Sequence, residues 1–97
     1  MRIIWSPLAI DRISEIADYI AKDNIDASVK WIEDIFNEIE RLRKFPESGR
    51  VVPEIDKNNI REIIYRNYRI VYQIGDKEIS ILTVRHFKQI LPLDDTS

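Results

Sequence analysis

The chain has 97 residues, of which 44% are hydrophobic and 33% are charged, and its formal net charge is −2. This length suits one domain, because a second hydrophobic core would have too little surface to bury. The absence of cysteine excludes disulfides, thiolate metal sites and cysteine nucleophiles, and it fits an expected location in a reducing cytoplasm. The uninterrupted apolar runs are far shorter than a membrane-spanning helix, so no membrane partner is expected.

Charge is divided unevenly along the chain. Residues 1–40 hold 4 basic and 9 acidic residues, a net charge of −5, whereas residues 41–91 hold 11 basic and 6 acidic residues, a net charge of +5. The small total therefore does not exclude an anionic partner, since an acidic first half offsets a basic second half.

The first half of the chain predicts one strand and two helices. Residues 2–5 are β-branched and aromatic, which favours a strand. The Ser6-Pro7 pair suits the start of a helix, and apolar residues recur at spacings of three and four over residues 10–20. After a break at residues 22–24, the apolar stripe of residues 25–44 predicts a second helix. Because the link is so short, the two helices should form an antiparallel hairpin.

The second half of the chain predicts strands. Proline and glycine within residues 45–50 end the second helix, and an irregular stretch is expected to follow. The spacing then becomes that of β-structure, with strands expected at 61–65, 68–74 and 78–86. Gly75-Asp76 is a hairpin turn signal between the last two of these strands.

The element order β-α-α-β-β-β predicts an α+β fold in which a helical hairpin packs on a small, mostly antiparallel sheet. The first strand must join the later three through non-local pairing, and spacing alone leaves the strand order open. We expect a single domain over residues 1–92 and a flexible acidic tail over residues 93–97.

Six short segments, taken together and in order, carry a family resemblance. They are Ile3-Ile4-Trp5-Ser6-Pro7-Leu8-Ala9, Phe45-Pro46-Glu47-Ser48-Gly49-Arg50, Val52-Pro53-Glu54, Arg61-Glu62-Ile63, Tyr68-Arg69-Ile70-Val71-Tyr72 and Ile81-Leu82-Thr83-Val84-Arg85-His86-Phe87. With these segments the chain resembles the ParE/RelE superfamily, the toxins of type II toxin–antitoxin systems, over nearly its whole length. The resemblance implies a cytoplasmic toxin that a cognate antitoxin protein neutralises in a toxin–antitoxin hetero-oligomer, with no cofactor.

The resemblance also implies two possible targets. ParE-like members poison DNA gyrase, and we expect this function, in which the chain would bind rather than catalyse. RelE-like members are endoribonucleases that cleave messenger RNA on the ribosome, and this function is the alternative. Nuclease relatives usually have a tyrosine where this chain has Phe87, which has no hydroxyl to give a proton. Their lysine-rich loop is reduced here to Lys57, and the long helix over residues 25–44 also fits the gyrase branch.

If the chain were a nuclease, the candidate catalytic residues would be Arg69, His86, Arg61 and Glu54. Attack by a 2′-hydroxyl needs a base, an acid and a cation for the developing negative charge. Arg69 matches the active-site arginine that the resemblance implies, and its apolar neighbours in the strand require that its charge has a partner. A two-residue turn would place Arg69 and His86 on one face of the sheet, and a three-residue turn would place them on opposite faces.

The loop carboxylate Glu54 has two interpretations. The resemblance to one nuclease subgroup implies a general base, whereas an ion pair with Arg50 or Arg61 is the simpler one. Further basic residues lie in or beside the predicted sheet and suit phosphate binding, although each could be an ordinary solvated charge. These anion or nucleic-acid candidates are Arg50, Lys57, Arg66, Arg85 and Lys88.

Apolar residues supply the remaining candidates. Leu91 and Leu93, beyond the last strand, are candidates for contact with a partner protein. Phe36 could line a groove for the same partner, but we expect it in the core, together with Trp31 and Tyr72. No metal site is expected, because the chain has one histidine, no cysteine and no paired carboxylate spacing.

Overall fold

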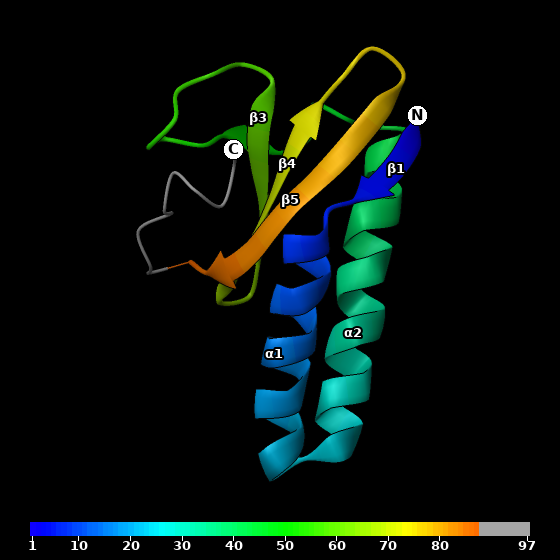
Figure 1. Cartoon of the computed structure of the whole chain (residues 1–97), viewed down its shortest axis with the longest axis vertical. Helices are drawn as coiled ribbons and strands as arrows, with labels where there is room; N and C mark the ends of the chain where they lie inside the picture. Colours follow the sequence, from blue (N-terminus) through cyan, green and yellow to red (C-terminus); the bar gives the residue numbers. More distant parts are fainter. Residues whose placement is uncertain (88–97) are drawn as a thin grey trace.

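The computed structural model describes residues 1–87, and these form a five-stranded sheet with two helices side by side on one of its faces (Figure 1). The elements are β1 (Arg2–Trp5), α1 (Pro7–Asp23), α2 (Ile25–Glu40), the 3-10 turn η1 (Arg41–Arg43), β2 (Arg50–Val51), β3 (Ile60–Tyr65), β4 (Tyr68–Ile74) and β5 (Glu78–His86). The predicted α+β class and helical hairpin are confirmed. The predicted tail over residues 93–97 lies outside the described residues.

The sheet has the strand order β1-β5-β4-β3-β2. β1 runs parallel to β5, and every other neighbouring pair is antiparallel, so the mostly antiparallel sheet is also confirmed. The parallel pairing is the non-local one, since β1 and β5 stand at opposite ends of the described chain. β2 was not predicted, because a two-residue strand beside proline and glycine carries no periodic signal.

Both helices begin at a capping side chain. The Ser6 hydroxyl accepts a hydrogen bond of 3.0 Å from the Ala9 amide, and the Asn24 side chain accepts one of 3.0 Å from the Ala27 amide. The Ser6 hydroxyl also donates to the Leu82 carbonyl at 2.9 Å, which ties the start of α1 to β5. α2 ends at Glu40, earlier than predicted, because its last residues tighten into η1. The hairpin extends beyond the sheet (Figure 1).

Two apolar cores lie on the two faces of the sheet. The larger one joins both helices to the sheet and includes Ile35, Leu42 and Tyr72. The smaller one lies on the other face, where Val52 and its neighbours in the loop before β3 cover Val71. We call the two sides of the sheet the helix face and the loop face. Trp31 is buried as expected, but the prediction for Phe36 was wrong, since its side chain is 45% exposed.

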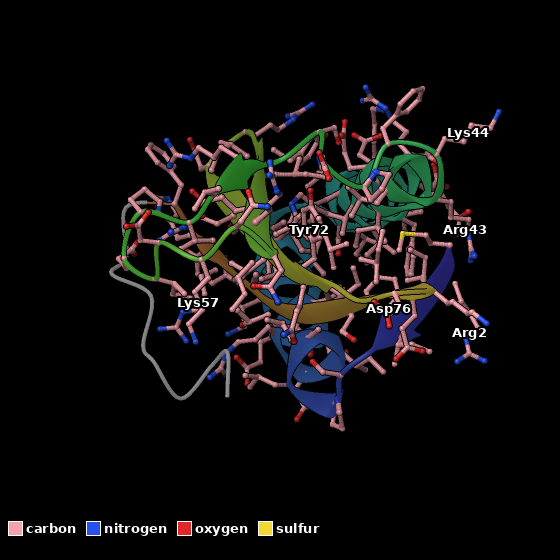
Figure 2. The ribbon with its side chains drawn as sticks, turned by 90° about the horizontal axis from the view of Figure 1, so that it is seen from above. Arg2, Arg43, Lys44, Lys57, Tyr72 and Asp76 are labelled. Atoms are coloured by element: carbon pink, nitrogen blue, oxygen red, sulfur yellow. The ribbon has the colours of Figure 1, made fainter. Side chains whose placement is uncertain are left out.

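Tyr72 fastens the loop before β2 from inside the molecule, where Figure 2 shows it. Its hydroxyl donates a hydrogen bond of 2.7 Å to the Pro46 carbonyl and accepts one of 3.0 Å from the Gly49 amide. A Cβ atom at Gly49 would lie 2.6 Å from both the Tyr72 hydroxyl and the Glu62 carbonyl. The loop can therefore approach the sheet this closely only with glycine at that position. Among residues 1–87, no helix is both long and apolar enough to cross a membrane.

A polar contact between α2 and β3 predicts a pH-dependent effect on stability. The Tyr65 hydroxyl donates a hydrogen bond to the Asp34 carboxylate, and this bond is the main cause that lowers the pKa of Asp34 below its ordinary value of 3.8. A carboxylate whose pKa is lowered by folding stabilises the fold above its unfolded pKa, and the contribution is lost as the pH falls through the folded pKa.

We therefore expect the variant Tyr65→Phe to unfold at a lower urea concentration than the wild type at neutral pH. The difference between their midpoints should shrink as the pH falls below 3.8, the ordinary pKa of this carboxyl. The matched control is Tyr19→Phe, whose ring is 72% exposed and whose change should have no such pH dependence. A difference between Tyr65→Phe and the wild type that stays constant over the whole range would contradict the assignment.

Candidate functional site

A β-bulge in the β4–β5 hairpin decides which candidate residues lie together. Near the turn, Gln73 pairs with Ser80, whereas further along Val71 pairs with Thr83, and the register shifts between Val71 and Tyr72. β5 therefore carries one extra residue at Leu82. An extra residue moves every following side chain of that strand to the other face of the sheet.

As a result, Arg69 and His86 lie on opposite faces of the sheet. Beyond the bulge, Arg69 pairs with Arg85, and Tyr68 pairs with His86. Paired residues share a face, and Tyr68 packs against the helix-face core. His86 thus lies on the helix face, with its ring centroid 5.8 Å from that of Tyr68, while Arg69 lies on the loop face.

Arg69 belongs to a chain of four alternating charges on the loop face, which we call the ion-pair chain: Arg50, Glu62, Arg69 and Glu54. Two guanidinium nitrogens of Arg69 donate to the Glu54 carboxylate at 2.6 and 2.8 Å, and its Nε donates to Glu62 at 2.6 Å. Arg50 donates to the other oxygen of Glu62 at 2.7 Å. The partner that the sequence required for Arg69 is therefore a pair of carboxylates.

The two central members of the ion-pair chain are removed from solvent. The side chains of Arg69 and Glu62 are only 4% and 0% exposed, respectively. The hydrogen bonds that Arg69 donates to Glu54, followed by the one to Glu62, raise the pKa of Arg69 above that of an ordinary arginine, against the opposing effect of burial. Its guanidinium is thus a permanent charge that two carboxylates already balance. Such a group ties the Glu54 loop to the sheet more readily than it binds a phosphate.

The other nuclease candidate, Arg61, also holds loop backbone. Its guanidinium donates to the carbonyls of Gly49 and Asn58 at 2.9 and 3.0 Å, and to the Asn58 side chain at 2.9 Å. Arg61 therefore joins the loops before β2 and β3. These contacts between a cation and neutral oxygens hold the two loops in position.

The remaining basic candidates are dispersed over the described surface. Arg66 lies in the β3–β4 turn with a φ of 54°, and its guanidinium lies 5.5 Å from the centroid of the Tyr65 ring. Lys57 projects from the loop before β3, on the opposite side of the molecule from Arg43 (Figure 2). Lys88, Leu91 and Leu93 lie outside the described residues. In residues 1–87 no three metal-ligating side chains are grouped so that they could hold an ion.

An apolar groove runs along the outer side of the helical hairpin, where sequence reasoning expected core. It has a volume of about 530 Å³ and is lined chiefly by Trp5, Ile10, Ile13, Ala17, Ile32 and Phe36. The rings of Trp5 and Phe36 meet at a centroid distance of 5.1 Å, and both Ile10 and Phe36 are exposed. The sequence does carry a sign of this groove, because Val29, Ile32 and Phe36 form a second apolar stripe on α2 beside the buried one.

Comparison with known proteins now identifies the family. The model for the "ParE toxin of type II toxin-antitoxin system, parDE" matches residues 3–91. The chain belongs to the ParE toxin family. A relative of this ParE toxin, described as "Putative toxin Y4kP" from Sinorhizobium fredii (strain NBRC 101917 / NGR234), is 37% identical over 93 residues, which are 94% of this chain and 93% of that protein.

A solved structure shares the fold of this ParE toxin. A chain of the "Chromosomal ParDE TA system from P. aeruginosa" superposes with a TM-score of 0.75 at 21% identity, over 91% of this chain and 97% of that one. The predicted resemblance to type II toxins is therefore confirmed, and the family match supports the ParE branch over the RelE-like alternative.

Proposed function

We propose that this ParE-family toxin acts in the cytoplasm by binding DNA gyrase and inhibiting it, without a catalytic step of its own. The observation that supports this most is the separation of Arg69 from His86 on opposite faces of the sheet. Cleavage of RNA would need a base, an acid and a cation to converge on one phosphate. Among the described residues, Glu54 and Arg69 lie together on the loop face, but the candidate acid His86 does not converge with them.

The state of Arg69 supports the same proposal. An arginine that stabilises a developing oxyanion must present donors to the substrate in a water-excluded site. The guanidinium of Arg69 instead donates hydrogen bonds to Glu54 and Glu62, and only 4% of the side chain is exposed. Moreover, Phe87 has no hydroxyl, so it cannot act as the general acid in place of the tyrosine that nuclease relatives usually have there. Inhibition through a binding surface is the simpler account of toxicity.

We also propose that the cognate antitoxin neutralises the toxin by covering the apolar groove of the helical hairpin. Exposed aromatic and aliphatic side chains gathered in one groove are costly to leave in water and are typical of a protein-binding surface. A groove of about 530 Å³ between two helices accepts the apolar face of a partner helix. Asp18 lines the same groove, so basic residues beside the apolar stripe of the partner would be favoured.

Induced expression separates the two targets. Cells would express the wild type or His86→Gln, and growth, plasmid supercoiling and the 5′ ends of messenger RNA would be followed together. We expect both proteins to stop growth and relax the plasmid without in-frame cuts in messenger RNA. In-frame cuts that the wild type makes and a folded His86→Gln does not would overturn the proposal in favour of the nuclease.

A further inference from the structure

A small pocket lies between the helical hairpin and the β3–β4 turn. Its volume is about 250 Å³, and it shares no lining residue with the apolar groove. Residues from α1, α2 and the turn line it together, on the helix face of the sheet. Those that bear on ligand binding are Ile20, Ala27, Trp31, Asp34, Arg66 and Tyr68.

Arg66 places a positively charged group in this pocket. Its Nε donates a hydrogen bond of 3.0 Å to the Tyr65 hydroxyl, and its guanidinium lies 5.5 Å from the centroid of the Tyr65 ring. These contacts orient the guanidinium but use neither of its terminal nitrogens, and within residues 1–87 Arg66 forms no ion pair. The two terminal nitrogens therefore form a donor fork of the kind that binds a carboxylate.

The backbone of Arg66 suggests that the side chain, rather than the turn, explains the arginine at this position. Its φ of 54° lies in the left-handed region, where glycine is favoured and arginine is uncommon. Residues held in such a conformation gather at ligand-binding sites, where the side chain compensates for the unfavourable backbone.

Asp34 limits the charge that the pocket accepts. Its carboxylate accepts a hydrogen bond from the Tyr65 hydroxyl and lies 3.4 Å from the Lys30 ammonium. Lys30 and Arg66 against Asp34 leave one positive charge in excess. A ligand with a single negative charge is therefore favoured, whereas Asp34 would repel a dianion.

The rest of the lining is apolar and aromatic. Ile20 and Ala27 lie there with the rings of Trp31 and Tyr68, whose centroids are 5.3 Å apart. The indole nitrogen of Trp31 is a buried donor with no acceptor in the described part of the chain, so a ligand oxygen that reached it would satisfy it. A cavity of about 150 Å³ already holds benzene, so about 250 Å³ has room for a ring and a short acid chain.

We propose that this pocket binds an organic monocarboxylate, that is, a single carboxylate carried on an apolar body about the size of one aromatic ring. The carboxylate pairs with the terminal nitrogens of Arg66, and the body lies against Trp31 and Tyr68. Such a group occurs in a free aromatic acid and at the end of a protein chain whose last residue is apolar. The proposal depends neither on gyrase as the target nor on the antitoxin.

Titration calorimetry with the full chain tests the ligand class. The probes are phenylpropionate, its uncharged amide, acetate and the dipeptide N-acetyl-alanyl-phenylalanine. We expect saturable binding of phenylpropionate, and at least about tenfold weaker binding of the amide, which lacks the charge, and of acetate, which lacks the body. A dipeptide that binds at least about tenfold more tightly than phenylpropionate identifies a chain terminus as the source, and a dipeptide without this gain identifies a free acid.

Variants decide whether this pocket is the site. Arg66→Gly should weaken phenylpropionate by at least about tenfold, while its urea midpoint stays close to that of the wild type, because glycine suits the backbone at this position. The matched control Lys57→Gln removes one positive charge from the loop before β3 and should leave affinity unchanged (Figure 2). Ala27→Leu fills part of the pocket at a helical position that accepts leucine, and it should weaken phenylpropionate as well.

Three results would overturn the proposal. The first is the absence of saturable binding to both phenylpropionate and the dipeptide. The second is equal affinity for phenylpropionate and its amide, since the guanidinium would then contribute nothing. The third is a loss of affinity in Arg66→Gly that Lys57→Gln matches, or unchanged affinity in both Arg66→Gly and Ala27→Leu, because the binding would then lie outside this pocket.

Discussion

Replacing Arg69 by methionine should lower the free energy of unfolding by about 3–5 kcal/mol, the usual cost of removing one partner from a buried ion pair. The Glu62 side chain is 0% exposed and would lose a hydrogen bond of 2.6 Å, and Glu54 would lose both of its bonds to the sheet. Urea unfolding followed by tryptophan fluorescence measures the change.

Two further variants test whether the ion-pair chain is the cause. Arg50→Met removes the outer arginine, whose side chain is 61% exposed, and should cost about 1 kcal/mol or less. Adding Glu62→Met to Arg69→Met should recover part of the stability, because no buried charge is then left unpaired. An Arg69→Met protein that keeps wild-type stability but loses toxicity would contradict this account and would support a catalytic role for Arg69.

Replacing Phe36 by aspartate should weaken binding of the cognate antitoxin by at least about 100-fold, an effect typical of an aromatic residue at the centre of an interface. The side chain is 45% exposed in the toxin alone and lines the apolar groove, so a charge there would be buried against the apolar face of the partner. Calorimetry with the purified antitoxin, and loss of neutralisation on co-expression, measure the effect.

Phe45→Asp is the matched control, because it makes the same chemical change at a phenylalanine that is 60% exposed and lies outside the groove. Its affinity for the antitoxin should equal that of the wild type. Both variants should remain folded, with Phe36→Asp losing chiefly its ring contact with Trp5, worth about 1 kcal/mol. Unchanged affinity in Phe36→Asp, or equal losses in both variants, would exclude the groove as the antitoxin site.

The parts of the fold that depend on local patterns were predictable. Ser6 was recognised as a cap from its place before proline and the apolar stripe, and its side chain does cap α1. Strand pairing was not predictable in the same way. The bulge at Leu82 has no periodic signal in the sequence, and its extra side chain packs against the loop-face core.

The β4–β5 hairpin shows how one extra residue in a strand changes the interpretation of a site. A bond of 2.8 Å from the Gly75 amide to the Glu78 carbonyl closes the turn around Asp76 and Lys77, one residue later than the predicted Gly75-Asp76 turn. Ile74 therefore pairs with Ile79, and the faces near the turn are still those of a two-residue turn. That turn would have placed Arg69 and His86 on one face. The bulge reverses the faces before His86 is reached, so a turn that gives the right faces near Gly75 still gave the wrong neighbour for Arg69.

The sequence predicted that Arg69 requires a counter-charge, but it did not predict which carboxylates supply it. The apolar neighbours of Arg69 in β4 required a counter-charge, yet Glu54 was expected to pair with Arg50 or Arg61. The loop before β3 folds across the sheet and brings Glu54 to Arg69, which spacing cannot show. The apolar groove was missed for a similar reason, because periodicity identifies an apolar stripe but not how much of it the sheet covers.

The most direct test of the central claim is a supercoiling assay with purified DNA gyrase, ATP and relaxed plasmid. We predict that ATP-dependent supercoiling falls as the folded chain is added, that His86→Gln inhibits as strongly as the wild type, and that the antitoxin restores activity. Gyrase that keeps full activity at a molar excess of the folded chain, while the same preparation cuts messenger RNA on translating ribosomes, would contradict the claim.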